Sequence, residues 1–188
     1  LGNYSSEGES IVALMSSNMI KDKKLLFTTK LGMIKLVDGS EFETNRKTMA
    51  ATKLGKDDEL VSVKITRVSE REAVPDDFES LDYEQMEFGQ MDNMVDVPVE
   101  TELRYTREIL VIQTEEGIFL RFPIKEVPEM KKSTLGVKGI KLNANDYVSN
   151  VYLLDVGDNE VVEYKGKQVD LRKLKIGKRG TKGVKVRR

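Results

Sequence analysis

Basic residues separated by glycines are concentrated in residues 175–188 of this 188-residue sequence. The stretch reads KIGKRGTKGVKVRR and contains seven Lys or Arg residues and three glycines. Lys and Arg side chains bind phosphates and release counterions from a polyanion. Glycines beside them let the backbone approach the anion and offer its amide donors. The chemistry indicated by this pattern is polyanion binding rather than catalysis.

The charge of the chain is strongly segregated although the net charge is only −1. Residues 164–188 hold eleven basic residues and one acidic residue, whereas residues 69–103 hold twelve acidic residues and one basic residue. We expect an acidic insertion at about residues 69–105, in the form of a long surface loop. It could solubilise the protein, or it could compete with a polyanion for the basic residues.

Several classes of function are excluded by composition. The sequence has no His and no Cys, which removes His or Cys nucleophiles, Ser-His-Asp triads and thiolate metal sites. Carboxylates are plentiful, but no pair is marked by its spacing, and no phosphate-binding P-loop is present. No apolar run reaches the roughly 20 residues that a membrane helix needs. We therefore expect a cytoplasmic domain with no catalytic site, metal or cofactor of its own and no membrane contact.

Short β-branched and aromatic runs dominate the sequence, which is typical of an all-β protein. Residues 25–63 and 109–151 follow the same order of features: a strand, a glycine turn, a strand, an acidic corner, a basic pair, a strand that ends at Lys-Leu (Lys53-Leu54 and Lys141-Leu142), an Asp turn and a last strand. Four short strands in about 40 residues indicate a propeller blade. We expect the core to include Leu26, Phe27, Ile34, Leu110, Ile112, Phe119, Phe122, Leu153 and Leu154.

A third copy, residues 159–186, is partial and stops before the last strand. Residues 11–15, IVALM, resemble that missing strand. They could complete the last blade by pairing with C-terminal strands, or they could belong to a blade that lies upstream. The sequence begins at Leu1 and not at Met, so we interpret residues 1–188 as a single domain that forms part of a longer chain.

The repeat resembles the C-terminal domain of the A subunit of bacterial type IIA topoisomerases, DNA gyrase and topoisomerase IV. LLFTTKLGMIKLVDGSEFETNRKTMAATKLGKDDELVSV and GIFLRFPIKEVPEMKKSTLGVKGIKL carry the resemblance, and the repeats cover about three quarters of the chain. The resemblance implies a β-pinwheel, a propeller-like ring of four-stranded blades with a basic rim that binds and bends duplex DNA. It also implies that the B subunit, the rest of the A subunit, ATP and Mg²⁺ act elsewhere in the parent enzyme, and that the domain is nucleoid-associated.

Gyrase carries a Gln-Arg-Arg-Gly-Gly-Lys-Gly box in its first blade, and residues 177–183 here read GKRGTKG. Arg179, Gly180, Lys182 and Gly183 match the box, and Lys178 is a conservative replacement. Gly177 and Thr181 differ, and this box lies late in the chain. These departures favour a topoisomerase IV-type subunit, with gyrase as the close alternative. The family's catalytic tyrosine lies in another domain, and no tyrosine here has a matching context.

A basic corner on each blade would give a curved line of cations that contacts phosphates without reading sequence. The alternative function is a protein-interaction propeller on which the charge is incidental. The predicted DNA-binding residues are Arg46, Lys47, Lys53, Lys131, Lys132, Lys138, Lys141, Lys175, Lys178, Arg179, Lys182, Lys185, Arg187 and Arg188.

Overall fold

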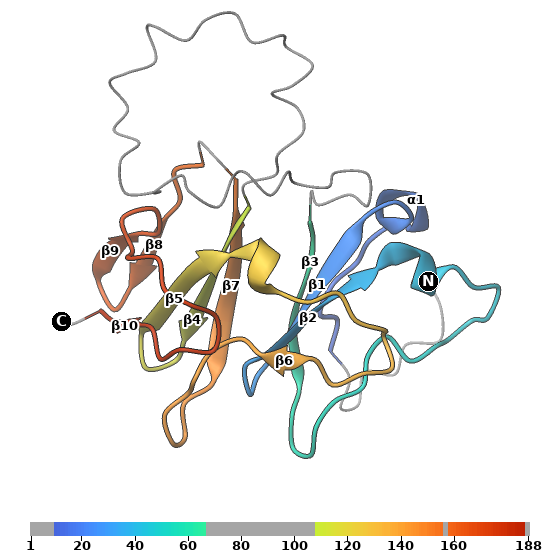
Figure 1. Cartoon of the computed structure of the whole chain (residues 1–188), viewed down its shortest axis with the longest axis horizontal. Helices are drawn as coiled ribbons and strands as arrows, with labels where there is room; N and C mark the ends of the chain where they lie inside the picture. Colours follow the sequence, from blue (N-terminus) through green and yellow to red (C-terminus); the bar gives the residue numbers. More distant parts are fainter. Residues whose placement is uncertain (1–9, 67–107, 156–157, 187–188) are drawn as a thin grey trace, which may run out of the picture.

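Two four-stranded antiparallel sheets stand side by side in the computed structural model, which describes residues 10–66, 108–155 and 158–186 (Figure 1). The first sheet has the order β3-β1-β2-β6 and the second has the order β10-β5-β4-β7. The first consists of β1 (Lys24–Thr29), β2 (Met33–Asp38), β3 (Leu60–Ile65) and β6 (Val137–Lys138). The second consists of β4 (Ile109–Thr114), β5 (Ile118–Pro123), β7 (Val148–Leu154) and β10 (Val184–Lys185).

The third copy forms a two-stranded hairpin, β8 (Val161–Tyr164) and β9 (Lys167–Asp170), at one end of the described structure (Figure 1). Gly166, at the turn between them, has a φ of +79°, and the hairpin glycines Gly32 and Gly117 have +78° and +77°. Glycine adopts this left-handed conformation without the steric cost that a Cβ imposes. The predicted glycine turns and the all-β fold class are confirmed.

The predicted Asp turns brace two of these hairpins from the neighbouring strand. The Leu31 amide donates to Oδ1 of Asp58 at 2.9 Å, and the Glu116 amide donates to Oδ1 of Asp146 at 3.0 Å. Each carboxylate also accepts the amide of the residue that follows it. Asp58 therefore links the β1–β2 hairpin to the start of β3, and Asp146 links the β4–β5 hairpin to the start of β7.

The outer strand of each sheet comes from the next copy of the repeat, which corrects the expectation that each copy builds its own blade. β6 pairs with β2, and β10 pairs with β5. Gly136 and Gly183, which directly precede β6 and β10, allow these strands to pair so closely. A Cβ on Gly136 would lie only 2.7 Å from the Ile34 carbonyl oxygen, and a Cβ on Gly183 would lie only 2.6 Å from the Phe119 carbonyl oxygen. The predicted strand ends at Lys53-Leu54 and Lys141-Leu142 are also wrong, because both pairs lie outside strands.

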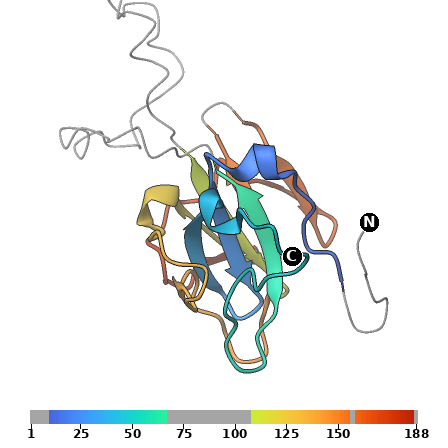
Figure 2. The same cartoon turned by 90° about the vertical axis from the view of Figure 1, so that its right-hand side faces the viewer.

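Residues 11–15 do not form a strand, so their predicted pairing with the C-terminal strands is wrong. Met15 instead packs, together with Ile20 of α1 (Ser17–Ile20), against the outer face of the first sheet. That face carries Leu25, Phe27 and Val37, and its burial favours any apolar segment that covers it. Figure 2 shows α1 beside η1 (Gly39–Phe42), the turn that follows β2.

The main core fills the space between the two sheets. It contains Leu26 and Ile34 from the first sheet and Leu110, Ile112 and Phe122 from the second. Its partly buried edge includes Leu153. A second cluster packs Phe119 and Leu154 against the third copy. The core residues predicted from sequence are therefore confirmed, except that Leu153 is only partly buried. The predicted acidic insertion, about residues 69–105, falls within residues 67–107, which lie outside the described residues.

Candidate nucleic-acid interface

The residues before β6 form a tight turn, residues 131–136, which we call the middle basic turn. The Thr134 amide and hydroxyl both donate to the Lys131 carbonyl, at 3.0 and 2.8 Å. Gly136 ends the turn with a φ of +89°, against the backbone of Ile34. The turn thus combines one side-chain bond, one backbone bond and one close approach that only glycine allows.

The residues before β10 form a turn of the same construction, residues 178–183, which we call the C-terminal basic turn. The Thr181 amide and hydroxyl donate to the Lys178 carbonyl at 3.2 and 2.7 Å. Gly183 has a φ of +73° and lies against the backbone of Phe119. The basic pairs predicted to be in register therefore share one backbone geometry in the second and third copies.

A carboxylate from the preceding corner holds each turn. Glu41, in η1, accepts the Lys132 amide at 3.1 Å through Oε2. Glu126, in η4 (Ile124–Glu126), accepts the Arg179 amide at 2.8 Å through Oε2. Both glutamates lie within the acidic corners of the repeat, so the corners predicted from sequence serve as anchors for the turns.

Lys35, on β2, holds the middle basic turn through hydrogen bonds from its side chain. The residue is 2% exposed, and its Nζ donates to the carbonyls of Lys131, Lys132 and Thr134 at 3.2, 2.8 and 2.7 Å. Burial lowers the pKa of this ammonium, while the Glu41 carboxylate acts in the opposite direction. The sequence prediction missed Lys35; the available signal was a lysine at the centre of the apolar strand MIKLV.

Arg121 plays a related role on β5. Its Nη1 donates to the Arg172 and Leu174 carbonyls at 2.6 and 3.0 Å. Burial lowers the pKa of this guanidinium, and the nearby Arg172 lowers it further. Arg121 therefore fixes the segment that leads from the β8–β9 hairpin toward the C-terminal basic turn, and not the turn itself.

The C-terminal basic turn is joined to residues 138–141, the segment that follows the middle basic turn and begins with the last residue of β6. The Gly180 amide donates to the Gly139 carbonyl at 2.7 Å, and the Lys141 amide donates to the Thr181 carbonyl at 2.9 Å. The guanidinium of Arg179 donates through Nη1 to the Lys138 carbonyl at 2.9 Å. Through these bonds the C-terminal basic turn continues into the segment that follows the middle basic turn, and we call residues 131–141 and 178–183 together the basic strip.

Not all predicted residues point into solvent from this strip. Lys132 and Arg179 are half-buried, and their side chains donate to the carbonyls of Glu41 and Lys138. The Lys53 amide donates to the Lys132 carbonyl at 3.2 Å, which links the first copy to the middle basic turn. The exposed predicted residues in the two turns and the segments bonded to them are Lys53, Lys131, Lys138, Lys141, Lys178 and Lys182.

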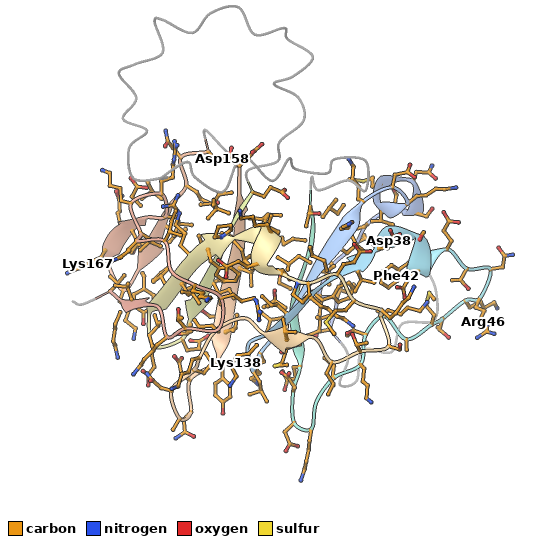
Figure 3. The ribbon with its side chains drawn as sticks, viewed as in Figure 1. Asp38, Phe42, Arg46, Lys138, Asp158 and Lys167 are labelled. Atoms are coloured by element: carbon orange, nitrogen blue, oxygen red, sulfur yellow. The ribbon has the colours of Figure 1, made fainter. Side chains whose placement is uncertain are left out.

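The remaining predicted residues lie at the margins. Lys175 is exposed ahead of the C-terminal basic turn, and Lys185 is exposed on β10, where its Nζ lies 3.5 Å from Glu116. Arg46 and Lys47 are exposed on the loop after η1, and Figure 3 places Arg46 at the far edge of the molecule from Lys138. Arg187 and Arg188 lie outside the described residues.

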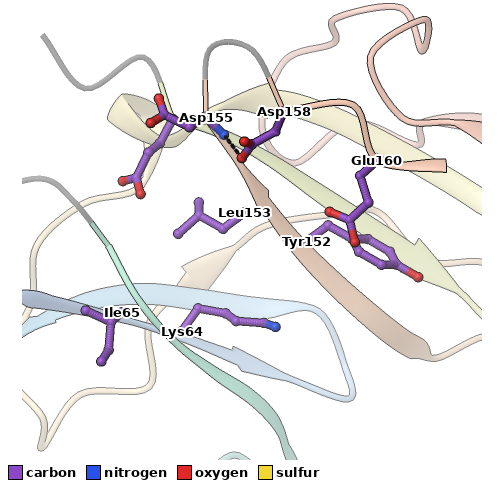
Figure 4. A pocket seen from close by; sticks show the side chains of 8 residues that line it. Lys64, Ile65, Tyr152, Leu153, Asp155, Asp158 and Glu160 are labelled. Carbon is purple, nitrogen blue, oxygen red and sulfur yellow. Dashed lines mark hydrogen bonds between the residues drawn. The ribbon is translucent and has the colours of Figure 1, made fainter. Parts of the chain in front are cut away.

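A pocket of about 240 Å³ lies away from the basic turns, between β3 and β7 (Figure 4). Its polar lining includes Glu108, Asp155, Asp158 and Glu160, with Lys64 on β3. The Asp155 amide donates to Asp158 at 2.8 Å. This acidic lining would repel a phosphate, so the pocket does not belong to the candidate interface.

Neither a metal centre nor a membrane helix is found in the part of the chain that the structure describes. In residues 10–66, 108–155 and 158–186, no three or more carboxylates are grouped in a way that could hold a metal ion. The helices within the same ranges are too short or too polar to cross a bilayer.

The chain is similar to known proteins over the segments that form the repeat. The family model described as DNA gyrase C-terminal domain, beta-propeller, matches residues 23–67, 108–155 and 165–188. The A subunit of DNA gyrase from Helicobacter pylori is 30% identical over 182 residues, which cover 94% of this chain and 18% of the relative. The corresponding gyrase protein of Fibrobacter succinogenes is 28% identical over 204 residues, covering 96% and 22%. The chain therefore spans about a fifth of the length of these relatives.

Solved structures share the fold. The C-terminal domain of DNA topoisomerase IV superposes with a TM-score of 0.60 at 23% identity, covering 87% of this chain and 41% of that one. The DNA gyrase A C-terminal domain gives a TM-score of 0.56 at 22% identity, covering 87% and 43%. Because the family model matches both four-stranded sheets and both basic turns, this chain belongs to the DNA gyrase C-terminal domain family, the β-propeller domains of type IIA topoisomerase A subunits.

Proposed function

We propose that this domain binds duplex DNA through its phosphates, without sequence specificity, along the strip formed by the two basic turns. The observation that carries the proposal is the repeated turn geometry, which presents Lys131 and Lys178 from equivalent positions in two successive copies of the repeat. Exposed lysines bind phosphates by releasing condensed counterions and do not read base edges. Neither turn contains an aromatic residue, which favours a duplex over a stacked single strand.

We further propose that the bound DNA is bent. The turns sit on the outer strands of successive blades, so their cations follow the rim of a propeller rather than a straight line. Bending 20–30 base pairs by 40–90° costs on the order of 1–6 kcal/mol, which several phosphate contacts can offset. Lys138, Lys141 and Lys182 would supply contacts beyond those of Lys131 and Lys178.

In the parent protein we propose that the domain supports ATP-dependent changes in DNA topology by a type II topoisomerase. The catalytic tyrosine, ATP and Mg²⁺ would be supplied by the B subunit and by the rest of the A subunit, in the cytoplasm. The incomplete box at residues 177–183 supports topoisomerase IV-like bending over full gyrase-type wrapping. DNA topology footprinting with the whole A subunit distinguishes these, because wrapping constrains positive supercoils and simple bending does not.

Binding to DNA is tested by fluorescence anisotropy across salt concentrations with linear duplexes of unrelated sequence. We expect binding that is sequence-indifferent and weakens steeply with salt. Changing Lys178 and Lys182 together to Glu should lower the slope of log K against log salt by about 1.8, at about 0.9 per lost phosphate contact. The matched control changes two exposed lysines outside the strip, Lys23 and Lys165, to Glu. Absence of binding at about 50 mM salt, or equal effects of both double variants, would overturn the proposal.

A further inference from the structure

Two carboxylates are bonded directly to the basic strip, where simple electrostatics would disfavour them. Glu41 and Glu126 are both partly buried, and each accepts the backbone amide of the second residue of a basic pair. A negative charge close to bound phosphates repels them, so a surface selected only for positive charge would lack both residues. Their recurrence at the same place in two copies needs a compensating role.

The bonding pattern supplies that role. A carboxylate that accepts a backbone N–H forms a charge-assisted bond, which is shorter and stronger than a neutral one. The bond from the Arg179 amide to Glu126 measures 2.8 Å and ties the C-terminal basic turn to η4. The bond from the Lys132 amide to Glu41 ties the middle basic turn to η1 in the same way, and Oε1 of Glu41 lies 3.8 Å from Nζ of Lys131.

The geometry points to Glu41 and Glu126 as positioning residues for DNA binding: each fixes the backbone of a basic turn, so that the flanking lysines are ordered before DNA arrives. This inference rests on the proposed function. Ordering a surface in advance lowers the entropy that binding must remove, which is about 0.5–1.5 kcal/mol for each long side chain. Removing the carboxylate should therefore weaken DNA binding although it makes the surface more positive.

The experiment compares variants of the whole chain. Glu126→Ala should weaken duplex binding at least about fivefold, as expected for two cations that lose their order. Glu126→Asp keeps the charge but withdraws the carboxylate by one methylene, and it should also weaken binding. The matched control is Glu115→Ala, which removes an exposed carboxylate from the β4–β5 hairpin. The control should leave binding unchanged or tighten it up to about threefold, because only a like charge is lost.

Hydrogen exchange of the Arg179 amide separates this inference from the proposed function. Both Glu126 variants should accelerate that exchange while the amides of β4 keep their protection, which also shows that the fold is intact. If the exchange accelerates but the wild-type chain does not bind DNA, the proposed function is wrong, and so is the role of Glu126 in DNA binding. Equal affinities of Glu126→Ala and Glu115→Ala, or unchanged Arg179 exchange, would overturn the positioning role even if the wild-type chain binds DNA.

Discussion

The middle and C-terminal basic turns have the same backbone but different supports. The middle turn lies over Lys35, which bonds three of its carbonyls from within the first sheet. At the matching place under the C-terminal turn is Leu120, which is buried and supplies no such donor. The C-terminal turn is instead hydrogen-bonded, through Gly180 and Arg179, to residues 138 and 139, which follow the middle turn.

The comparison separates what the repeat requires from what each copy can vary. Both turns keep the Thr bonds, the carboxylate anchor and the glycine at positive φ. They differ in the cation whose hydrogen bonds hold the turn in place. This cation is the buried Lys35 for the middle turn and the half-buried Arg179 for the C-terminal turn. The shared elements should therefore tolerate substitution least, and to the same degree in both turns.

The largest expected effect comes from the shared glycines. Gly136→Ala and Gly183→Ala should each lower the free energy of unfolding by about 2–4 kcal/mol, because the new Cβ meets a backbone oxygen and φ is left-handed. Gly166→Ala is the matched control, since its φ of +79° is similar but no atom lies within 4 Å of the new Cβ. The control should cost only about 1 kcal/mol. Urea denaturation measures all three, and equal losses at Gly136 and Gly166 would contradict a role for the close approach.

Lys35→Met tests the support that only the middle turn has. We expect a loss of about 2–3 kcal/mol, because three carbonyls lose their donor while the apolar volume is roughly kept. Lys23→Met, at an exposed position, should change stability by less than about 0.5 kcal/mol. Hydrogen exchange should accelerate at Thr134 and remain unchanged at Thr181. An increase in stability would show instead that relieving the desolvation of the ammonium outweighs the lost bonds.

Much of this architecture could be predicted from the sequence because local signals were strong. Strands such as LLFTT and EILVIQ are short, apolar and bounded by glycine or charge, so their positions and burial were predicted correctly. The repeat then placed the basic pairs at equivalent corners. Lys131 and Lys178 do occupy equivalent positions in two neighbouring turns.

The exchange of outer strands could not be predicted, because β6 and β10 have only two residues each and a strand of two residues carries no periodicity. The pattern of residues 11–15 was equally uninformative, since an apolar run fits either a strand or a cover over Leu25 and Phe27. The sequence also cannot show which Lys and Arg side chains form hydrogen bonds within the protein instead of pointing into solvent. Lys132 and Arg179 look like their exposed neighbours until their carbonyl partners are known.

The smallest expected effect concerns the two donated strands. Lys185 on β10 lies 3.5 Å from Glu116 in the β4–β5 hairpin, whereas the matching place beside β6 is occupied by Leu31. The pKa of Glu116 is lowered chiefly by the hydrogen bond from Asn143 and further by Lys185. A lowered folded-state pKa gives stability that is complete above the ordinary Glu pKa and is lost as pH falls through the folded value.

Wild type should therefore be slightly more stable than Glu116→Gln at pH 7, and this difference should vanish when both are acidified below the lowered pKa. Lys185→Met should reduce the pH-dependent part without removing it, because the Asn143 bond remains. Lys138→Met, at the position on β6 that is equivalent to Lys185 on β10, should leave the pH dependence unchanged. Unfolding midpoints in urea at several pH values measure the difference. If the difference in stability did not change with pH, the ionised carboxylate would not be what holds β10, and the two donated strands would be held alike.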